Sequence, residues 1–439
     1  MSDKSRLEEL SDEELLQELV RRRAARLEGD ARQAESTLLE DGDELARQGL
    51  QSYLQQCSQN QSDKPRRCPN CGGLTPVKAR NRTLTRLSSV GEVTYARHYY
   101  YCSLCKLGFY PLDDDLSLPS EGKLTAEMER RLLDLGANAP QEETAQRWSV
   151  HYSTSISTKL VRDTLERHGK MLVEESPHRI QARVAPRTSN TADVVYVETD
   201  GTTVNTREHG KREVKVGVIF DREHHLRGNR GRRGLITQAR YVAHLDGLDG
   251  FDEQLKAALK MEAVEQAKQV VWLADGDRAL WLQAKRLCPK ALQILDWYHA
   301  TEAASDCAQV LFDRATACRE VFVETVATLL WDLGPERVIE ELEQCMFVAK
   351  AAQQKEALRE LHRYYSNNKE RMQYKRYDEM GLMIGSGVIE ASHRHVLHSR
   401  MRRAGQIWAL DGAERMAKLR ALYQTVGPAD FYDVLRDAA

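Results

Sequence analysis

VVYVETDGTTV, residues 194–204, is the stretch that decides the expected fold. Its β-branched and aromatic residues form an apolar run, which is typical of a buried strand. Asp200 and Gly201 interrupt that run. We therefore expect Asp200 to end the strand, where the carboxyl edge of a sheet presents side chains to a cleft.

Two other short motifs carry an isolated carboxylate. Asp275 follows the apolar run of VVWLADGDRALW (270–281). Glu390 lies in IGSGVIEASHRH (384–395), where Gly-Ser-Gly favours the start of a helix. Asp277 competes with Asp275, but it would enter the turn after the strand. Each Asp-Gly pair could by itself be an ordinary turn, so the prediction depends on all three carboxylates together.

Strand, strand and helix is the order in which an RNase H-like core supplies three metal-binding carboxylates. Hard divalent cations prefer oxygen ligands, so Mg²⁺ or Mn²⁺ is the expected cofactor. Two such ions held together can activate a water and stabilise the leaving oxygen in phosphodiester cleavage. The pattern therefore predicts an enzyme that cuts and joins DNA.

The surrounding sequence predicts a mixed sheet. Three consecutive strands are expected within DVVYVETDG, REVKVGVIFD and LITQARYVAHLD, followed by helix, strand, helix and strand. That succession is the layout of an RNase H-like sheet. The predicted fold is multidomain α/β, with an RNase H-like catalytic core at residues 190–300 and 376–425. A helical insertion at residues 301–375 interrupts that core.

Two Cys-x-x-Cys pairs precede the core. Cys68 and Cys71 form the first pair, and Cys102 and Cys105 form the second, with 30 residues between the pairs. Four thiolates can close a tetrahedral Zn²⁺ site with no open position, so this zinc would be structural. The intervening residues alternate like a hairpin, which predicts a zinc ribbon-like module at residues 65–112. Free thiols or disulfides are the alternative.

Two helical regions flank that module. Residues 1–60 are predicted to form an N-terminal helical segment, either solvated or dimerising. Residues 120–180 have the proportions of a DNA-binding helix-turn-helix, with a second helix starting near Ser155. A three-helix structural linker is the alternative. The second helix would present four polar or basic side chains to a DNA groove: Ser157, Thr158, Lys159 and Arg162.

Two arginine-rich segments are candidates for contacts with DNA phosphates, although solvated basic surfaces are the alternative. The loop LRGNRGRRG (226–234) joins two predicted strands and contains Arg230, Arg232 and Arg233. The helix that carries Glu390 continues through a basic run. That run contains His393 and Arg394, on the same helix face as Glu390, and Arg400 further on.

Four motifs together resemble a known family. They are VETDGT (197–202), LADGDRALW (273–281), DWYHA (296–300) and IGSGVIEASHRHVLHSRMRRAGQIW (384–408). They are similar to blocks of bacterial insertion-sequence transposases of the ISKra type, and the last block is the most specific. Those proteins are DDE transposases with a helical insertion between the second Asp and the Glu. The resemblance covers roughly residues 65 to 425.

The resemblance assigns roles to individual residues. It implies that Asp200, Asp275 and Glu390 are the catalytic, metal-binding triad. It also implies that Asp296 and His299 form an accessory Asp-x-x-His motif near the active site. A buried, hydrogen-bonded pair is the alternative for these two residues.

Composition limits the class of protein. The chain has 439 residues with 41% hydrophobic residues, which suits roughly two to four domains with sizeable cores. No apolar run approaches the roughly 20 residues needed to cross a bilayer, so no membrane partner is expected. The acidic N-terminus lacks the apolar segment of a signal peptide. Nine cysteines, four of them in the quartet, favour a reducing compartment. We expect a cytoplasmic, nucleoid-associated bacterial protein.

The sequence thus predicts a DDE transposase that cleaves and transfers the DNA strands of an insertion sequence. Its expected partner is double-stranded DNA, at the transposon ends and at the target, and it is expected to act as a homodimer or higher oligomer. The net charge of −2 shows that any DNA-binding charge must be locally concentrated. Two alternatives remain: a catalytically silent, zinc-containing DNA-binding regulator, and a stand-alone RNase H-like nuclease.

Overall fold

The computed structural model describes residues 11–119, 122–189, 191–226 and 234–436. It is a mixed α/β structure that divides into two compact units. The N-terminal unit comprises the residues up to 132 together with 141–161, and the C-terminal unit comprises 133–140 together with the residues from 162 on. Within the described ranges, no helix is both long enough and apolar enough to span a bilayer.

The N-terminal unit combines long helices with a three-stranded antiparallel sheet of order β3-β4-β5. Two helices contribute residues to both units, namely α5 (Ala126–Asn138) and α7 (Thr158–Glu174). The other elements are α2 (Asp12–Ala24), α3 (Ala31–Gln59), β1 (Arg66–Arg67), β2 (Leu74–Thr75), β3 (Val77–Ser88), β4 (Gly91–Cys102), β5 (Leu107–Phe109), α4 (Pro111–Asp115) and α6 (Gln141–His151).

Helix α3 packs along the edge of β4. Leu54 of α3 contributes to a small core with Val93 and Tyr95 of β4. Polar side chains of α3 bind the strand backbone, since Gln51 Oε1 accepts a hydrogen bond from the Thr94 N–H at 2.7 Å. The helix therefore satisfies strand groups that would otherwise be an open sheet edge.

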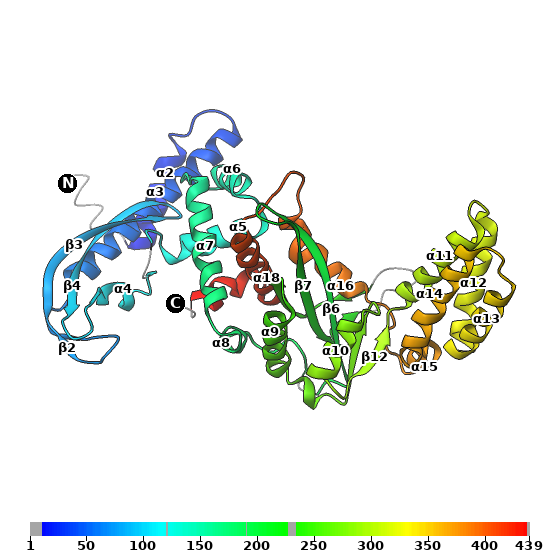
Figure 1. Cartoon of the computed structure of the whole chain (residues 1–439). Helices are drawn as coiled ribbons and strands as arrows, with labels where there is room; N and C mark the ends of the chain where they lie inside the picture. Colours follow the sequence, from blue (N-terminus) through cyan, green and yellow to red (C-terminus); the bar gives the residue numbers. More distant parts are fainter. Residues whose placement is uncertain (1–10, 120–121, 190, 227–233, 437–439) are drawn as a thin grey trace, which may run out of the picture. The chain divides into compact units, whose positions relative to one another are not determined.

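The C-terminal unit contains a five-stranded sheet and the remaining helices (Figure 1). The strands of the five-stranded sheet are β6 (Val194–Thr206), β7 (Gly210–Asp221), β10 (Arg240–Leu245), β11 (Gln269–Ala274) and β12 (Leu292–Leu295), and a separate two-stranded sheet consists of β8 (His225–Leu226) and β9 (Leu235–Ile236). Its helices are α8 (Pro177–Ala182), α9 (Leu248–Met261), η1 (Val264–Gln266), α10 (Arg278–Leu287), α11 (Trp297–Phe312), α12 (Thr316–Asp332), α13 (Pro335–Val348), α14 (Ala352–Asn368), η2 (Lys369–Arg371), α15 (Tyr374–Glu379), α16 (Gly387–Ser392), the π-helix η3 (His393–His398), α17 (Ser399–Met401) and α18 (Leu410–Arg436).

The five strands lie in the order β10-β7-β6-β11-β12. Strands β6, β7 and β10 form an antiparallel meander, whereas β11 and β12 run parallel to β6. Within this sheet the predicted succession of three strands, helix, strand, helix and strand is therefore present, although the third predicted strand is split into β9, which pairs with β8 outside this sheet, and β10. In the parallel part, Leu273 pairs with Glu198, and Ala274 pairs with Leu295.

The prediction that Asp200 ends its strand is wrong. Strand β6 continues to Thr206, and Asp200 pairs with Val216 of β7 within a long antiparallel hairpin. Thr202, Thr203 and Val204 are strand formers with partners in β7, so the Asp-Gly pair does not turn the chain. Only the pairing with β11 stops before Asp200, which leaves this side of the residue open.

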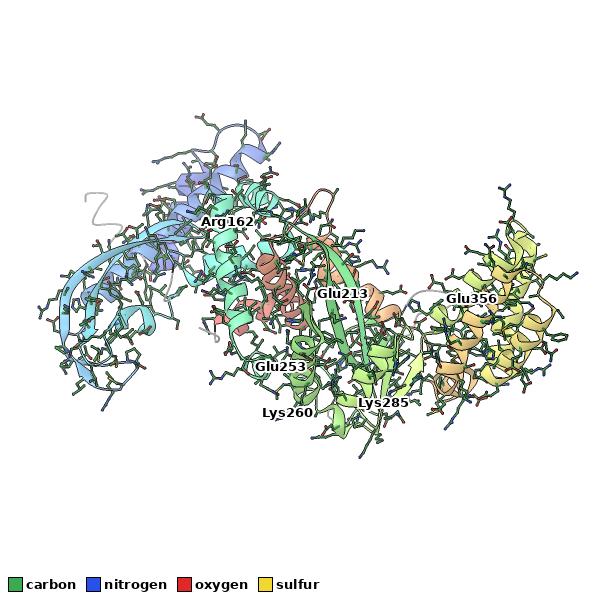
Figure 2. The ribbon with its side chains drawn as sticks, viewed as in Figure 1. Arg162, Glu213, Glu253, Lys260, Lys285 and Glu356 are labelled. Atoms are coloured by element: carbon green, nitrogen blue, oxygen red, sulfur yellow. The ribbon has the colours of Figure 1, made fainter. Side chains whose placement is uncertain are left out.

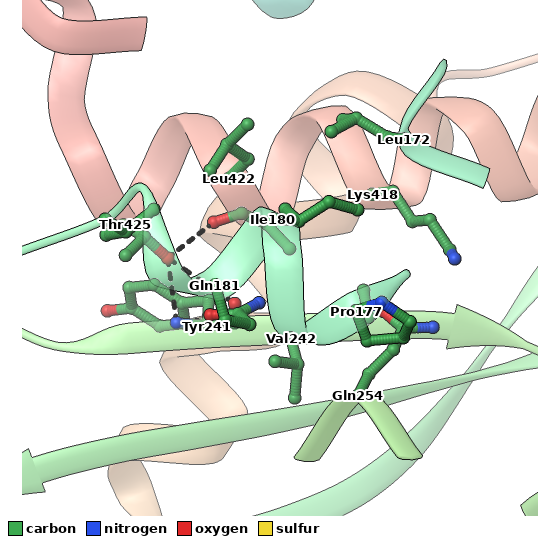
Figure 3. A pocket seen from close by; sticks show the side chains of 13 residues that line it. Leu172, Pro177, Ile180, Gln181, Tyr241, Val242, Gln254, Lys418, Leu422 and Thr425 are labelled. Carbon is green, nitrogen blue, oxygen red and sulfur yellow. Dashed lines mark hydrogen bonds between the residues drawn. The ribbon is translucent and has the colours of Figure 1, made fainter. Parts of the chain in front are cut away.

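Helices cover the sheet on its faces and along one edge. Gly217 of β7 allows close packing, because a Cβ there would lie 2.9 Å from Val242 and 3.2 Å from Phe251 of α9. Helix α18 follows the outer edge of β10. Figure 3 shows Thr425 of α18 beside Tyr241, whose N–H donates to its hydroxyl at 2.9 Å. This contact protects an edge strand that could otherwise pair with another chain.

The segment between β12 and α16 is helical (Figure 1). Its core includes Trp297 of α11, which makes edge-on contacts with Trp331 at 5.6 Å and Tyr374 at 4.7 Å between ring centroids. The Tyr365 hydroxyl of α14 donates to the Ala300 carbonyl at 2.8 Å. These contacts join the helices of the segment into one packed group directly after the last strand.

Candidate functional site

Three acidic residues reach the same level of the sheet, where β11 and β12 end beside the middle of β6. The observed pairing of β6, β11 and β12 places Asp200 level with Asp275, and Asp275 level with Asp296. Apolar residues precede each of these carboxylates, so the strands themselves are anchored in the core. The sheet thus concentrates negative charge at one edge.

Asp200 and Asp275 influence each other electrostatically. Burial raises the pKa of Asp200 to about 6, and the charge of Asp275 adds to that rise, against a lowering effect of the Gly201 N–H. That N–H donates to Asp200 Oδ1 at 2.7 Å. Within the described ranges, no lysine or arginine forms an ion pair with either carboxylate. This uncompensated pair of oxygen-ligand side chains fits a divalent cation such as Mg²⁺.

Asp277 has a structural role at the start of a helix. Its side chain caps α10 by accepting a hydrogen bond from the Ala279 N–H at 2.7 Å. Asp275 directly follows β11, and its backbone carbonyl accepts a hydrogen bond from the Tyr364 hydroxyl of α14 at 2.8 Å. Asp275 Oδ1 also accepts a backbone hydrogen bond, from the Asp277 N–H at 2.9 Å, so the two residues differ in place: Asp275 directly follows the strand, whereas Asp277 caps the helix.

Glu390 lies on α16, at the lining of a large groove. His299 and Arg394 line the same groove. The potential ligand atoms of Asp200, Asp275 and Glu390 are not gathered within 4.8 Å of one another, although all three residues are among those described. The Glu390 side chain is exposed, so the three carboxylates do not form one tight cluster in this structure.

Two buried carboxylates hold the start of α16. Asp296 accepts hydrogen bonds from the His299 N–H at 2.9 Å and from the Ser386 N–H. Glu198 Oε2 accepts a hydrogen bond from the Ile389 N–H at 2.8 Å. The segment that leads to Glu390 is thus bound directly to the carboxyl edge of the sheet.

The predicted Asp296–His299 motif therefore separates into two parts. Asp296 is buried and caps α11 through the His299 backbone, not through the imidazole. The His299 side chain lies 3.3 Å from Glu302 and lines the groove. Asp296 is a positioning residue, whereas the imidazole of His299 is available to a bound substrate.

Glu198, two residues before Asp200, is fully buried and was not among the predicted site residues. Desolvation raises the pKa of Glu198 to about 8, the Ile389 N–H opposes the rise, and Asp296 and Glu390 add to it. Its Oε1 atom has no hydrogen-bond partner among the residues that the structure describes. The alternation of side chains along a strand was the available signal, because it places Glu198 and Asp200 on the same face.

Replacing Glu198 with Gln should make stability less sensitive to pH. The folded-state pKa lies above the unfolded value of 4.5, so wild-type stability is lost as pH rises from about 4.5 to about 8, by up to about 1.4 kcal/mol per unit. Glutamine cannot ionise, yet its oxygen can still accept from the Ile389 N–H. Melting curves recorded without added divalent ions should show a wild-type-to-E198Q difference that grows with pH, and a constant difference would contradict this assignment.

The π-helix after α16 brings two histidines to the site. His393 Nδ1 lies 3.8 Å from Asp200 Oδ2, and its buried Nε2 has no hydrogen-bond partner in the described part of the chain. Burial lowers the pKa of His393. His398 Nε2 lies 2.9 Å from the Thr202 hydroxyl, so the π-helix is bonded to the strand that carries Asp200. Local π-helical geometry often occurs at functional sites.

The predicted DNA contacts fall into different environments. Arg400 is fully buried, donates to the Gly136 carbonyl at 3.2 Å and lies over Trp408, so it supports the core and we leave it out of the proposed DNA surface. Arg394 is exposed on the groove. The predicted phosphate-binding residues Arg230, Arg232 and Arg233 lie outside the described residues.

The helix-turn-helix candidates are all exposed at the start of α7. This helix begins at Thr158 and not near Ser155, because the Ser157 hydroxyl accepts from the Leu160 N–H at 3.1 Å. Lys159 follows in the first turn, and Arg162 projects from the helix surface (Figure 2). Their contact with DNA stays a prediction.

The four predicted zinc ligands converge. The sulfur atoms of Cys68, Cys71, Cys102 and Cys105 all lie within 4.8 Å of one another, and no other set of three or more potential ligands in the described ranges is so close. One pair belongs to the β1–β2 turn, where Gly72 adopts φ +70°, and the other to the β4–β5 turn. Hydrogen bonding from the Cys105 backbone lowers the pKa of Cys102 to about 6. This donor set fits one structural Zn²⁺.

Comparison with known proteins places the chain in a family. Residues 35–429 match the model of a family described as an uncharacterised protein family, UPF0236. The chain belongs to this family. One UPF0236 protein of Caldanaerobacter subterraneus subsp. tengcongensis is 23% identical over 389 residues, which cover 88% of this chain and 76% of that protein. A second from the same organism is 24% identical over 347 residues, covering 78% of this chain and 68% of the relative.

The name of the first relative groups eleven locus designations of that organism, and the name of the second groups four. Among solved structures, the chain is similar to one in the Drosophila P element transposase strand transfer complex, at 10% sequence identity. The alignment covers 71% of this chain and 94% of the other, with a TM-score of 0.34. A TM-score this low does not establish a shared fold.

Proposed function

We propose that this chain is a DDE transposase of an insertion sequence, of the ISKra type, which cleaves DNA at the element's ends and transfers the strands to a target. The observation that carries the proposal is the arrangement at the sheet edge. Asp200 and Asp275 lie at the same level on neighbouring parallel strands, and α16 with Glu390 is bonded to the strand that holds Asp200.

The sheet supports an RNase H-like core as part of this proposal. Three consecutive antiparallel strands are followed by two strands parallel to the first, and only β7 runs against the other four. This is the order expected of an RNase H-like sheet. The helical segment between β12 and α16 then corresponds to the insertion of such transposases.

The relatives provide an independent argument. One name covers eleven locus designations of a single organism. A protein that moves its own gene is expected to occur in many copies within one genome. A stand-alone nuclease or a silent regulator gives no such expectation.

Asp200, Asp275 and Glu390 would hold divalent cations in this proposal, with the exposed Glu390 side chain turning toward the aspartates. Bound Mg²⁺ or Mn²⁺ would supply an activated water and stabilise the leaving oxygen of the phosphodiester. Asp296 and Glu198 keep α16 in position for this arrangement. The four cysteines would hold a structural zinc apart from the chemistry.

The side chains of His393 and Arg394 would have distinct roles at this site. Burial lowers the pKa of His393, so this residue is neutral near pH 7 and can act as a hydrogen-bond partner of Asp200 or of a phosphate. The exposed guanidinium of Arg394 can balance the charge of a phosphate in the groove. Double-stranded DNA at transposon ends and target is the proposed partner, bound by a homodimer or larger assembly.

The test is strand cleavage of an end-labelled duplex that carries the element's terminus, with and without Mg²⁺. We expect cleavage that requires the metal and leaves a free 3′ hydroxyl, which attacks target DNA in the second step. Cleavage of unrelated duplexes with equal efficiency would favour the stand-alone nuclease. Specific binding without any cleavage would favour the silent regulator.

We also expect no covalent protein–DNA intermediate. Water is the first nucleophile and the DNA 3′ hydroxyl the second, so no side chain needs to form a bond with phosphorus. Reactions quenched in denaturant should contain cleaved DNA that migrates free of protein on denaturing gels. A protein–DNA adduct formed without divalent metal would contradict the proposed mechanism.

A further inference from the structure

The three-stranded sheet of the N-terminal unit carries tyrosines that are covered by cations. Lys78 Nζ lies 4.2 Å from the ring centroid of Tyr101, and the Arg82 guanidinium lies 4.7 Å from that of Tyr99. Tyr110 packs 5.2 Å from Tyr99, and its hydroxyl accepts a hydrogen bond from Arg82 at 3.4 Å. We name these five residues the cation–tyrosine ladder.

The strands explain why the ladder lies on one face. Tyr99 and Tyr101 are two residues apart on β4, so their side chains share a face. On β3, the register shifts between Ala79 and Arg82, and Asn81 adopts φ +51°. Arg80, inside this irregular stretch, pairs with Asp63 at 3.0 Å and takes no part in the ladder.

The two cations of the ladder have no acidic partner within the described ranges. Lys78 and Arg82 are exposed, and neither forms an ion pair with any residue that the structure describes. By contrast, Arg97, which covers Tyr110 at 3.6 Å, pairs with the buried Asp113. The exposed charge of Lys78 and Arg82 is therefore not needed to neutralise the fold.

The stretch of chain that contains the ladder is strongly basic, so its complementary partner is a polyanion. Residues 61–112 contain nine lysines and arginines against two acidic residues, within a chain whose net charge is −2. Stacking on tyrosine restricts the long side chains of Lys78 and Arg82, so less side-chain freedom is lost when they bind a phosphate. The ring faces are already occupied by cations, which favours contact with the DNA backbone over stacking on bases.

We propose that the cation–tyrosine ladder binds the phosphate backbone of duplex DNA without sequence preference. The proposal rests on the proposed function only in that the chain acts on DNA. It concerns neither the carboxylate site nor α7. The ladder would add a holding contact, while sequence recognition would reside elsewhere.

The test uses the full-length, zinc-loaded chain and a short duplex of random sequence, with affinity measured by fluorescence anisotropy at several salt concentrations. The K78Q/R82Q variant should lower the slope of log affinity against log salt by roughly 1.8, because each lost phosphate contact accounts for about 0.9. Near 0.1 M salt, this corresponds to a loss of affinity of roughly fiftyfold. The matched control is R80Q, which removes one charge from the same strand and should stay within about twofold of wild type, as expected for a surface charge held in its own ion pair.

A second pair of variants separates the effect of the two positive charges from the effect of the tyrosines that restrict them. Y99L/Y101L keeps both cations but removes their support, so affinity should fall by roughly fivefold with the salt slope unchanged. K78R/R82K keeps both charges and should keep the wild-type slope. Zinc content should match wild type in every variant, since these side chains do not hold the metal.

The outcomes separate this proposal from the function it rests on. Absence of any DNA binding by the wild-type chain would overturn both. DNA binding in which K78Q/R82Q matches R80Q would overturn the ladder and leave the proposed function intact. Preferential binding of an acidic protein or of duplex RNA over duplex DNA would also overturn it.

Discussion

Replacing Asp275 with Ala should abolish strand cleavage while leaving DNA binding nearly unchanged. Its carboxylate follows β11 at the level of Asp200, and each of the two contributes to the uncompensated negative charge of the sheet edge. Loss of a ligand removes several kcal/mol of metal-based charge stabilisation, which corresponds to roughly a thousandfold or more in rate. Single-turnover cleavage of a labelled end with Mg²⁺ measures the effect. D200A and E390A should behave alike.

The matched control for Asp275 is its neighbour Asp277. Asp277 caps α10, so D277A should destabilise the helix by about 1 kcal/mol and leave cleavage largely intact. Normal cleavage by D275A together with loss in D277A would reverse the assignment. Loss of DNA binding in D275A would show that the residue serves folding or affinity, and not the chemistry.

The sequence predicted the sheet well because its signals were local. Apolar runs before Asp200, Asp275 and Asp296 specify three strands, and the parallel pairing follows from helices that connect them. The spacing of the cysteines specified their convergence in the same way. Each of these features has a signal in a short stretch of sequence, namely an apolar run or a Cys-x-x-Cys pair.

Features that depend on distant partners could not be predicted. Glu198 looked like part of a strand, and its partner, the Ile389 N–H, is 191 residues away. Arg400 belongs to an arginine-rich run that favoured a solvated or DNA-binding face. Its acceptor, the Gly136 carbonyl, is 264 residues away, and no local pattern indicates that the guanidinium is buried there.

The cysteine quartet should control the folding of its module. In C102S, we expect zinc to fall from about one ion per chain to near zero, because three thiolates leave the tetrahedral site open. Amide hydrogen exchange should then increase across β4 and β5 and remain slow in β6 and β11. Zinc quantification and exchange on the same preparation measure both effects.

The size of the effect follows from how little apolar material the module contains. The core cluster at this end consists of Cys68, Tyr100, Cys102 and Phe109, with two partly buried residues, Val77 and Cys105, packed against it. Three of these six are predicted zinc ligands, so metal binding would replace the hydrophobic burial that a larger domain would have. Zinc sites of this kind contribute about 10 kcal/mol or more to the folding of small modules.

C318S, which alters an exposed thiol of α12, is the matched control and should keep its zinc. Full zinc occupancy in C102S would show that the quartet is not the metal site, whereas exchange that increases equally in β6 and β11 would show that the module is not an independent folding unit.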